Sequence, residues 1–498
     1  MSNKVVIVGA GAAGCFTAYR LWEMYKDEDA YDITLLERND RVGGNAYSTT
    51  VQYGGQDYNI DCGAQFFYRN PQVSYVELLN DLGLFNSDTI TSAATGFNIY
   101  DKKTKAFRLR VPGFYGGLLT LSAKEWSNLV LFGVFLIYAV VLDAGDDWEM
   151  SVDEWFEGEL DFMPESFKNE IIKPFFYQFV TLPYDKIGEA SAKYAVTYFV
   201  RNVFGEPGED PPDPDTQSTD SKWFPIIKTY QSRIGLDGVM KKALERAGVT
   251  PVLGANVTGV TFDAAGGLTV HSSKGDHEAD RLVLACHAPF AGQILDGSGA
   301  DPALVETLKN MPYAGIGLSI QKDGSCYMPD DESKWQAVNT IVEDETIMFS
   351  AWFGPLRKKY DGDKRIPVFK SWGTPELSPK NCAHRFLPHG HYVVLPTVDF
   401  MKRRAKVQAA QGNEGVWFAG GWTNWFDSQE AALDSATMVA EAMPGVVQPN
   451  TGRSRMVSVA HEKHAHNVRR WAERVAKAAP GDAGKPIEEA LKNLDPSR

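Results

Sequence analysis

The sequence predicts an α/β protein whose main parallel sheet is assembled from segments that lie far apart in the chain. Three observations support this fold class. A strand, a glycine-rich turn and a helix follow one another over residues 5–25, a second such unit covers residues 415–443, and a long aromatic-rich helical stretch separates them. Buried strands that alternate with helices are typical of parallel sheets covered by helices. We therefore expect a Rossmann-like domain built from discontinuous segments, together with a second domain of the α+β class.

The first unit has the detailed pattern of a nucleotide-binding turn. Val5–Val8 is apolar without polar alternation, as in a strand that is buried on both faces. It leads into Gly-Ala-Gly-Ala-Ala-Gly over residues 9–14. Gly9 permits the tight turn, Gly11 lets the backbone approach a pyrophosphate, and Gly14 lets the helix pack on the strand. The helix N-terminus adds free N–H groups and the positive end of its dipole.

The second strand, over residues 32–36, ends at Glu37. An acid at this position accepts hydrogen bonds from a ribose, and its charge disfavours the extra phosphate of NADP. Gly43 and Gly44 follow shortly, so their N–H groups could close on the pyrophosphate from the other side. The sequence therefore predicts dinucleotide binding, against the alternative of a glycine turn with a purely structural role.

On these residues the chain resembles the superfamily of flavin-containing amine oxidases and phytoene desaturases, whose members continue the acid with Arg-x-Gly-Gly. Asp61–Gln65 resembles the following segment, which borders the flavin ring in the superfamily. Gly415–Trp422 and the helix after it resemble the C-terminal segment that meets the ribityl chain and the pyrimidine edge. The strand over 252–257 resembles the one that meets the adenine, which places Val257 there. The resemblance covers nearly all of residues 4–445.

Within the superfamily, the chain most resembles a bacterial flavoprotein group that is often encoded beside cyclopropane-fatty-acyl synthases. This finer resemblance rests on Ser151–Phe156, Ile171–Pro174, His389–His391 and residues 412–435. It implies an oxidoreductase linked to lipids and does not name a reaction.

The resemblance implies FAD as the cofactor and a set of residues that bind it. These residues are Gly9, Gly11, Ala13, Gly14, Glu37, Arg38, Gly43, Gly44, Asn45, Gly63, Ala64, Gln65, Val257, Gly420, Gly421, Glu430, Ala431 and Ala432. The chain departs from the pattern at Asn45, where relatives commonly have Arg, and at Gly421, which replaces a frequent acid. Residues 412–443 contain no Cys or His that could link the flavin, so we expect non-covalent FAD.

The motifs suggest how the chain divides into domains. We expect an FAD-binding domain from residues 1–69, 231–300 and 405–445, and a substrate domain from residues 70–230 and 301–404. Residues 446–498 would form a C-terminal helical extension, with a basic amphipathic helix over 453–478. The proline-rich acidic stretch 206–220 is expected to be a solvated loop.

The expected function is transfer of a hydride from a hydrophobic, lipid-like small molecule to FAD. A flavin-dependent amine oxidase and an FAD-dependent double-bond isomerase of a fatty acid stay open as alternatives, and a non-enzymatic flavin carrier is the alternative from another class. No catalytic acid or base is assigned. His384, His389 and His391 flank a Pro-Gly turn and could line the flavin pocket, or simply form a polar turn.

Composition restricts partners and location. Lys and Arg total 50 against 64 Asp and Glu, a formal net charge of −14 that repels nucleic acids. Five scattered cysteines without a Cys-x-x-Cys pair favour a reducing compartment, and we expect a cytoplasmic protein. The apolar run Leu129–Leu142 is shorter than the roughly 20 residues that span a bilayer, so we expect a buried helix, with peripheral membrane contact left open.

No metal site is expected. The stretch from His461 to His466 resembles a zinc motif but lacks its second histidine, because residue 465 is Ala. The oligomeric state stays open.

Overall fold

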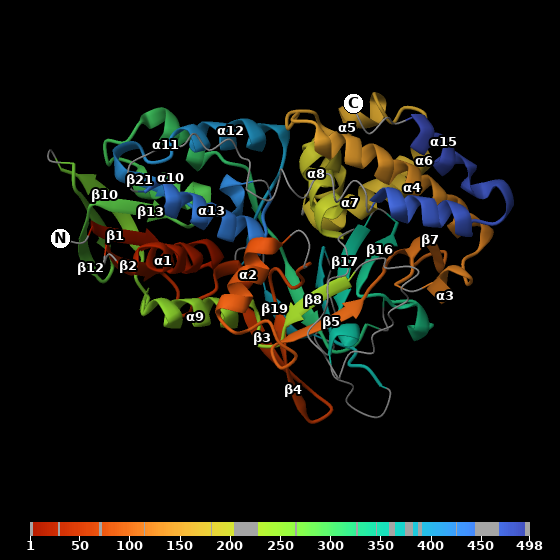
Figure 1. Ribbon diagram of the computed structural model, residues 1–498, viewed down its shortest axis with the longest axis horizontal. Helices are drawn as coiled ribbons and strands as arrows, with labels where there is room; N and C mark the ends of the chain where they lie inside the picture. Colours follow the sequence, from red (N-terminus) through yellow and green to blue (C-terminus); the bar gives the residue numbers. More distant parts are fainter. Residues whose placement is uncertain are drawn as a thin grey trace.

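Distant parts of the chain form a five-stranded parallel sheet at one end of the molecule (Figure 1). The structure is a computed structural model that describes residues 3–27, 30–68, 72–113, 115–180, 182–203, 228–263, 266–324, 327–344, 346–357, 364–373, 382–386, 391–424, 426–443 and 468–493. In sheet order the strands are β21 (Val416–Phe418), β13 (Arg281–Leu284), β1 (Asn3–Val8), β2 (Tyr31–Glu37) and β9 (Val252–Leu253). This sheet confirms the predicted α/β fold class.

The two faces of β1 pack against different layers, which explains its unbroken apolar run. Val5 and Ile7 belong to a core shared with three helices on one face. Val6 and Val8 belong to a core shared with a small antiparallel sheet and one helix on the other. The helices of the first face are α1 (Ala12–Tyr25), α9 (Leu236–Ala247) and α13 (Gln429–Ala442), and the second layer holds β10 (Val257–Phe262), β11 (Leu268–Ser272), β12 (Gly275–Ala279) and α10 (Ala288–Leu295).

Two further helices, α11 (Pro302–Lys309) and α12 (Val398–Ala409), pack on the same side of the molecule. α11 lies against α10, where Gly292 allows close contact, since a Cβ on Gly292 would lie 2.8 Å from the backbone nitrogen of Lys309. α12 packs on α11 in turn. We therefore move the domain boundaries suggested at 300 and 405 to 309 and 398.

A seven-stranded sheet forms the second domain, and α4 (Ala123–Ala144), α7 (Lys173–Val180) and α8 (Ala192–Tyr198) pack around it (Figure 1). In sheet order its strands are β19 (Cys382–Phe386), β15 (Leu318–Gln321), β18 (Phe369–Trp372), β17 (Thr346–Trp352), β16 (Val338–Glu343), β6 (Phe97–Asp101) and β7 (Ala106–Val111). π-helical turns adjoin two of the helices, Lys168–Ile172 before α7 and Phe199–Val203 after α8. Such turns are rare and are frequent at functional sites.

Shorter elements complete the fold. The remaining helices are α2 (Val73–Asp81), α3 (Tyr115–Leu118), α5 (Val152–Glu157), α6 (Glu165–Phe167) and α15 (Lys485–Asn493). The remaining strands pair as β3 (Ser48–Tyr53) with β4 (Gln56–Asp61), β5 (Ile90–Ala94) with β8 (Lys228–Ser232), and β14 (Tyr313–Gly315) with β20 (Tyr392–Val394).

The long apolar run lies within α4, which extends past it at both ends. Ser122 and Glu125 form a capping box that starts the helix. Among the described residues, α4 is the one helix long and apolar enough to cross a membrane by length and composition, with a mean hydropathy of 2.0. Its apolar window is 61% buried inside the protein, in agreement with the prediction of a core helix.

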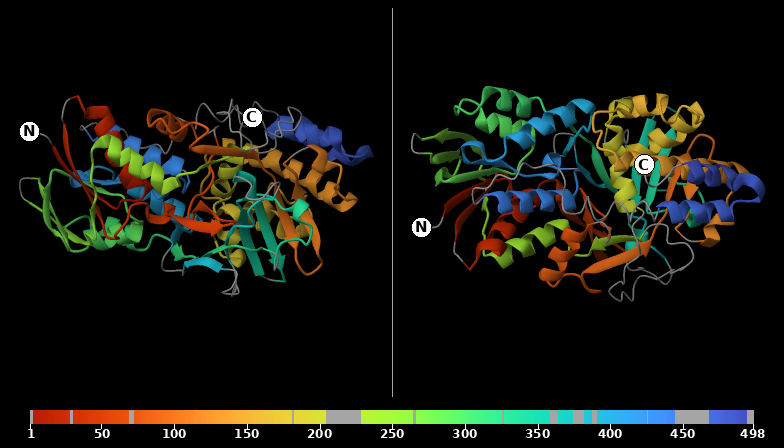
Figure 2. Two further views of the ribbon diagram at one scale, coloured as in Figure 1. Left: turned by 90° about the horizontal axis from the view of Figure 1, so that it is seen from below. Right: turned by 45° about the horizontal axis from the view of Figure 1, so that its top comes forward.

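The C-terminal extension covers part of α4 (Figure 2). Residues 468–478 are helical and α15 follows them. A Cβ on Gly133 of α4 would lie 2.7 Å from Cδ1 of Ile487, and the ring of Trp471 meets Phe132 edge-on at 6.4 Å. The start of the predicted basic helix, His461 to His466 and the proline-rich stretch 206–220 lie outside the described residues.

Ile487→Ala tests whether this extension is part of the stable fold. Because the Ile487 side chain is fully buried, we expect the free energy of unfolding to fall by about 2–4 kcal/mol. Urea unfolding measures the change. Leu119→Ala, at a side chain that is 76% exposed, is the control and should leave stability nearly unchanged. Equal effects of the two substitutions would mean that α15 does not contribute to the core.

Candidate functional site

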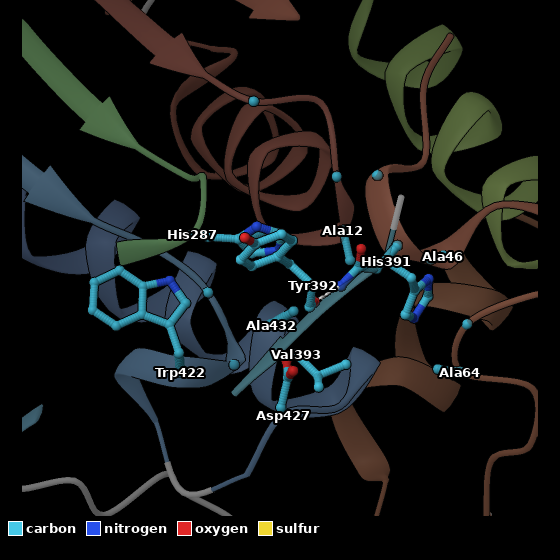
Figure 3. A pocket seen from close by; sticks show the side chains of 18 of the residues that line it. Ala12, Ala46, Ala64, His287, His391, Tyr392, Val393, Trp422, Asp427 and Ala432 are labelled. Atoms are coloured by element: carbon cyan, nitrogen blue, oxygen red, sulfur yellow. Dashed lines mark hydrogen bonds between the residues drawn. The ribbon is translucent and has the colours of Figure 1, made fainter. Parts of the chain in front are cut away.

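A cavity of about 790 Å³ lies where the carboxyl ends of the parallel strands face the seven-stranded sheet (Figure 3). Residues that follow β1, β2, β13 and β21 line it on one side. Side chains of α8, β17 and β18 line it on the other. Ligands of open α/β sheets bind at this edge, so the cavity is the candidate cofactor and substrate site.

The glycine turn after β1 leaves no room for side chains at two of its positions. Gly9 has φ +104°, and a Cβ there would lie 2.9 Å from the carbonyl oxygen of Ala285. A Cβ on Gly14 would overlap the carbonyl oxygen of Gly9, so this residue packs the helix and does not line the cavity. Gly11 and Ala13 do line it. Gly9 therefore makes the predicted tight turn and Gly14 the predicted close packing, while the approach of Gly11 to a pyrophosphate stays a prediction.

Glu37 ends β2 at the cavity wall, and its carboxylate already accepts three hydrogen bonds. Oε2 accepts from the backbone N–H of Ala10 at 2.7 Å. Oε1 accepts from the backbone N–H of Asn39 at 2.8 Å and from the Asn39 amide at 2.6 Å. A carboxylate has about four lone-pair sites, which leaves one for a ribose hydroxyl.

The second glycine pair lies directly opposite the first turn. The N–H of Gly43 donates to the carbonyl oxygen of Ala10 at 2.8 Å, and a Cβ on Gly44 would lie 3.1 Å from Cα of Gly11. The Asn45 amide donates to the carbonyl oxygen of Tyr392 and thus spans the cavity wall. The guanidinium of Arg38 lies 4.6 Å from the ring of Phe290. Backbone faces backbone between Gly11 and Gly44 in the cradle that the two glycine turns form, and the side chain of Asp237 lies against Gly43. The Gly43 N–H is already donated to Ala10, so it is not free to close on a pyrophosphate as the sequence suggested.

The segment after β4 meets a cationic side chain of β18 at the cavity. A Cβ on Gly63 would overlap the carbonyl oxygen of Asn45, so the chain passes closely here. The buried ammonium of Lys370, on β18, donates to the carbonyl oxygen of Gly63. Burial lowers the pKa of Lys370 to about 8. Ala64 and Gln65 also line the cavity, and Oε1 of Gln65 is buried without a hydrogen-bond partner among the described residues.

At the C-terminal unit, Gly420, Gly421 and Ala432 line the cavity. Asp427 points into it (Figure 3), and a Cβ on Gly421 would lie 2.8 Å from Oδ1 of Asp427. This contact explains why residue 421 carries no side chain, because the carboxylate of Asp427 occupies that space. Burial raises the pKa of Asp427 to about 6.

Glu430 and Ala431 do not line the cavity, contrary to the sequence prediction. The carboxylate of Glu430 instead accepts from the backbone N–H groups of Ser74 and Tyr75, at 3.0 and 2.7 Å. These are unpaired donors of the first turn of α2, and a buried acid satisfies them. The side chain of Glu430 therefore fixes α2 against α13.

Val257 lines the cavity, its contact with an adenine stays a prediction, and the strand predicted over 252–257 divides in two. β9 ends at Leu253 and β10 begins at Val257, and the N–H of Ala255 between them donates to the carbonyl oxygen of Glu37 at 2.8 Å. Val257 thus lies beside the predicted ribose site.

Two of the histidines that the structure describes line the cavity, and both are neutral at physiological pH. Burial, with Arg38 nearby, lowers the pKa of His287 to about 4. Burial, with Lys370 nearby, lowers the pKa of His391 to about 3. Neither imidazole therefore carries a proton to donate as imidazolium at neutral pH. The side chains of His384 and His389 lie outside the described residues.

Sequence reasoning missed Lys370, Asp427 and His287 as lining residues. Lys370 lies on a strand between aromatic residues, and no spacing in the sequence marks it. The sequence predicts a C-terminal helix over residues 427–443, but α13 begins at Gln429, so Asp427 lies before the helix and faces the cavity.

The cavity fits a dinucleotide by the chemistry of its walls. Two glycine turns present backbone without side chains, a helix N-terminus follows the first of them, and Gln65 holds an unpartnered acceptor. The residues named from the sequence would hold FAD here, with Gly14, Glu430 and Ala431 acting only through packing. Bound FAD supplies the ability to accept a hydride.

Glu37→Ala tests the ribose contact. A charge-assisted hydrogen bond is worth roughly 1.5–3 kcal/mol, so we expect FAD affinity to fall about ten- to a hundredfold. The loss of the partner of the Ala10 N–H adds to this effect. Fluorescence titration of FAD-free protein measures the affinity. Unchanged affinity would show that Glu37 only supports the turn.

Comparison with known proteins agrees with the geometry. The structure resembles a CLA-producing fatty acid isomerase from P. acnes, at 13% identity and a TM-score of 0.59. It also resembles putrescine oxidase bound to putrescine, at 15% and 0.58, and cyclohexylamine oxidase from Brevibacterium oxydans IH-35A, at 16% and 0.57. Each similarity covers 89% of this chain and 99% of the other, and at these identities it shows the fold alone.

No curated protein matches the sequence. The family of flavin containing amine oxidoreductases matches residues 12–317, which is more than half of the 498 residues. On this match, the chain belongs to the flavin containing amine oxidoreductase family.

Proposed function

We propose that this flavin-dependent oxidoreductase transfers a hydride from an apolar, lipid-like substrate to FAD. The observation that carries the proposal is the aromatic wall of the cavity, which the substrate domain forms together with Phe426 of the C-terminal unit. Phe426 stacks between Tyr194 and Tyr198, with ring centroids 4.6 and 4.4 Å away, and Phe349 stacks on Trp372 at 3.7 Å. Such a wall selects hydrocarbon surface, since each buried methylene contributes about 0.8 kcal/mol.

We further propose that FAD is held without a covalent bond. Cys62 and Cys286 line the cavity and are its cysteines among the described residues. Burial raises the pKa of each thiol to about 12, so both stay protonated at neutral pH. A thiol is a poor nucleophile without deprotonation, which argues against a cysteinyl link.

One observation favours amine oxidation as the second candidate. Asp427 adjoins Phe426 of the aromatic stack, and its backbone N–H donates to the Tyr194 hydroxyl at 3.2 Å. A carboxylate beside aromatic rings is a favourable place for an ammonium group. The lipid proposal is preferred because aromatic and aliphatic side chains, among them Phe349, Leu318 and Val338, also line this wall.

Anaerobic mixing of the FAD-loaded protein with single compounds separates the candidates. With oleyl alcohol or oleic acid, the proposal predicts bleaching of the flavin absorbance and an oxidised lipid. Bleaching by benzylamine or dodecylamine, with none by the lipids, would overturn it in favour of an amine oxidase. Repeated conversion of oleic or linoleic acid to an isomer, with the flavin oxidised at the end, would instead identify an isomerase.

Asp427 gives the site a predictable pH dependence. Its pKa of about 6 in the folded protein lies above the ordinary value of 3.8, so the folded state retains its proton more strongly. Stability of the FAD-free protein should then decrease as pH rises from about 4 to 6, where this proton is lost. Asp427→Asn should therefore raise the Tm more at pH 7.5 than at pH 4.5. A Tm difference that is the same at both pH values would contradict this assignment.

A further inference from the structure

Two buried polar atoms on the substrate-domain wall have no hydrogen-bond partner among the described residues. They are Oε1 of Gln178, on α7, and Nε1 of Trp372, on β18. Gln178 is only 4% exposed, and both side chains line the cavity. Buried polar atoms are nearly always paired, so an acceptor and a donor left open on one cavity wall require an explanation.

The orientation of the Gln178 amide is fixed by its other hydrogen bond. Its Nε2 donates to the Thr340 hydroxyl at 2.6 Å, and that hydroxyl is directed at the carbonyl oxygen of Pro174, 3.5 Å away. Thr340 therefore presents a lone pair to the amide nitrogen. The amide oxygen is the atom that remains for the cavity, and it can only accept a hydrogen bond.

The sheet register brings the two open atoms to the same part of the wall. Thr340, Phe349 and Trp372 are direct neighbours across β16, β17 and β18. Adjacent strands lie about 4.8 Å apart, so the backbones of Thr340 and Trp372 lie roughly 10 Å apart on either side of Phe349, and Gln178 is bonded to the Thr340 hydroxyl. Trp372 is two residues beyond Lys370 on β18, about 7 Å further along the strand.

The pair selects the chemistry of the group that it would bind. Gln178 needs a donor and Trp372 needs an acceptor. A hydroxyl or a carboxamide offers both. A carboxylate has no proton for Gln178, an alkylammonium has no lone pair for Trp372, and a hydrocarbon has neither.

We propose that Gln178 and Trp372 form a subsite for the neutral hydroxyl or amide head of an otherwise apolar substrate. The subsite specifies the substrate class of the proposed function. Binding at the subsite can be measured without a reaction, and only the statement that the bound molecule is oxidised rests on the proposed function. The aromatic stack around Phe426 and the wall residues Leu318 and Val338 then face the hydrocarbon part.

Ligand binding to the FAD-loaded protein tests the subsite without turnover. Dodecanol, dodecanamide, dodecanoate, dodecylamine and dodecane share one chain length and are titrated against the change in flavin absorbance. We expect dodecanol and dodecanamide to bind at least about tenfold more tightly than dodecane, and more tightly than dodecanoate and dodecylamine.

Two variants assign the preference to the named atoms. Trp372→Phe keeps an aromatic ring against Phe349 and removes the N–H together with part of the indole, and Gln178→Leu removes the acceptor. Each should reduce the preference for dodecanol over dodecane about fivefold or more. Trp417→Phe is the matched control, since the Trp417 indole nitrogen is also buried and unpartnered but lies outside the cavity lining. It should keep the preference.

The outcomes separate this inference from the proposed function. Equal binding of dodecanol and dodecane, or tighter binding of dodecanoate than of dodecanol, overturns the subsite. Because this ranking is measured on the unaltered protein, it tests the subsite even if a variant fails to fold. A preference that survives both variants also overturns it, because the open atoms then hold only water. If dodecanol is preferred but no lipid bleaches the flavin under anaerobic conditions, the subsite stands and the proposed function is wrong. If a lipid bleaches the flavin but no head group is preferred, the proposed function stands and the subsite is wrong.

Discussion

Gly11→Ala should raise the Kd for FAD at least about a hundredfold while the protein still folds. A Cβ on Gly11 would lie 3.9 Å from Cα of Gly44, which is an ordinary contact, and φ of −77° suits alanine. The methyl group would nevertheless enter the cradle between the two glycine turns, where the backbone must approach the pyrophosphate. Fluorescence titration gives the Kd, and circular dichroism and Tm of the FAD-free protein report the fold.

Gly259→Ala is the matched control for this substitution. Gly259 lies on β10 of the same domain, outside the cavity lining, and its Cβ would meet only the carbonyl oxygen of Ile294 at 4.0 Å. This variant should bind FAD normally. Tight binding by Gly11→Ala would place the pyrophosphate elsewhere.

Lys370→Met should slow anaerobic reduction of the flavin about a hundredfold. Lys370 holds a buried positive charge beside Gly63, in the segment whose resemblance implies contact with the flavin ring. Reduction adds negative charge to the ring system, and a fixed cation in a water-poor site stabilises that charge. Stopped-flow absorbance measures the rate, and the midpoint potential of the flavin should fall in the same variant.

The control for this loss is a second buried lysine. Lys193 is 3% exposed and donates to the carbonyl oxygen of Asp143 at 2.7 Å, away from the cavity lining. Lys193→Met should leave the potential of the bound flavin unchanged, whatever it does to stability. An unchanged potential in Lys370→Met as well would show that the ammonium lies too far from the ring to act on it.

The nucleotide-binding half of the cavity could be predicted because the residues that form it lie close together in the sequence. Gly9 and Gly14 are tied to a single strand–turn–helix unit, and Glu37 ends the next strand of the same sheet. At Gly9 and Gly14 a Cβ would meet backbone atoms, so only glycine fits there. The glycine pattern in the sequence therefore predicts this turn.

The substrate half could not be predicted, because tertiary packing alone brings its residues together. Lys370 and Gln178 reach the cavity from a strand and a helix that no motif links. Glu430 was assigned to the cofactor because it lies in a cofactor-like helix, but its carboxylate binds the N-terminus of α2, far away in the sequence. Asp427 was missed because its position depends on the missing side chain at Gly421, where a Cβ would lie 2.8 Å from Oδ1 of Asp427.

The central claim, that this cavity binds FAD without a covalent bond, is tested most directly by the flavin content of the purified protein. Absorbance is recorded before denaturation in acid and again on the protein and the filtrate after ultrafiltration, with the released flavin identified by chromatography. The account predicts a flavin spectrum in the native protein and FAD in the filtrate, close to one per chain. Flavin that stays with the denatured protein would contradict non-covalent binding, and protein that neither carries FAD nor takes it up would contradict the assignment of the cavity.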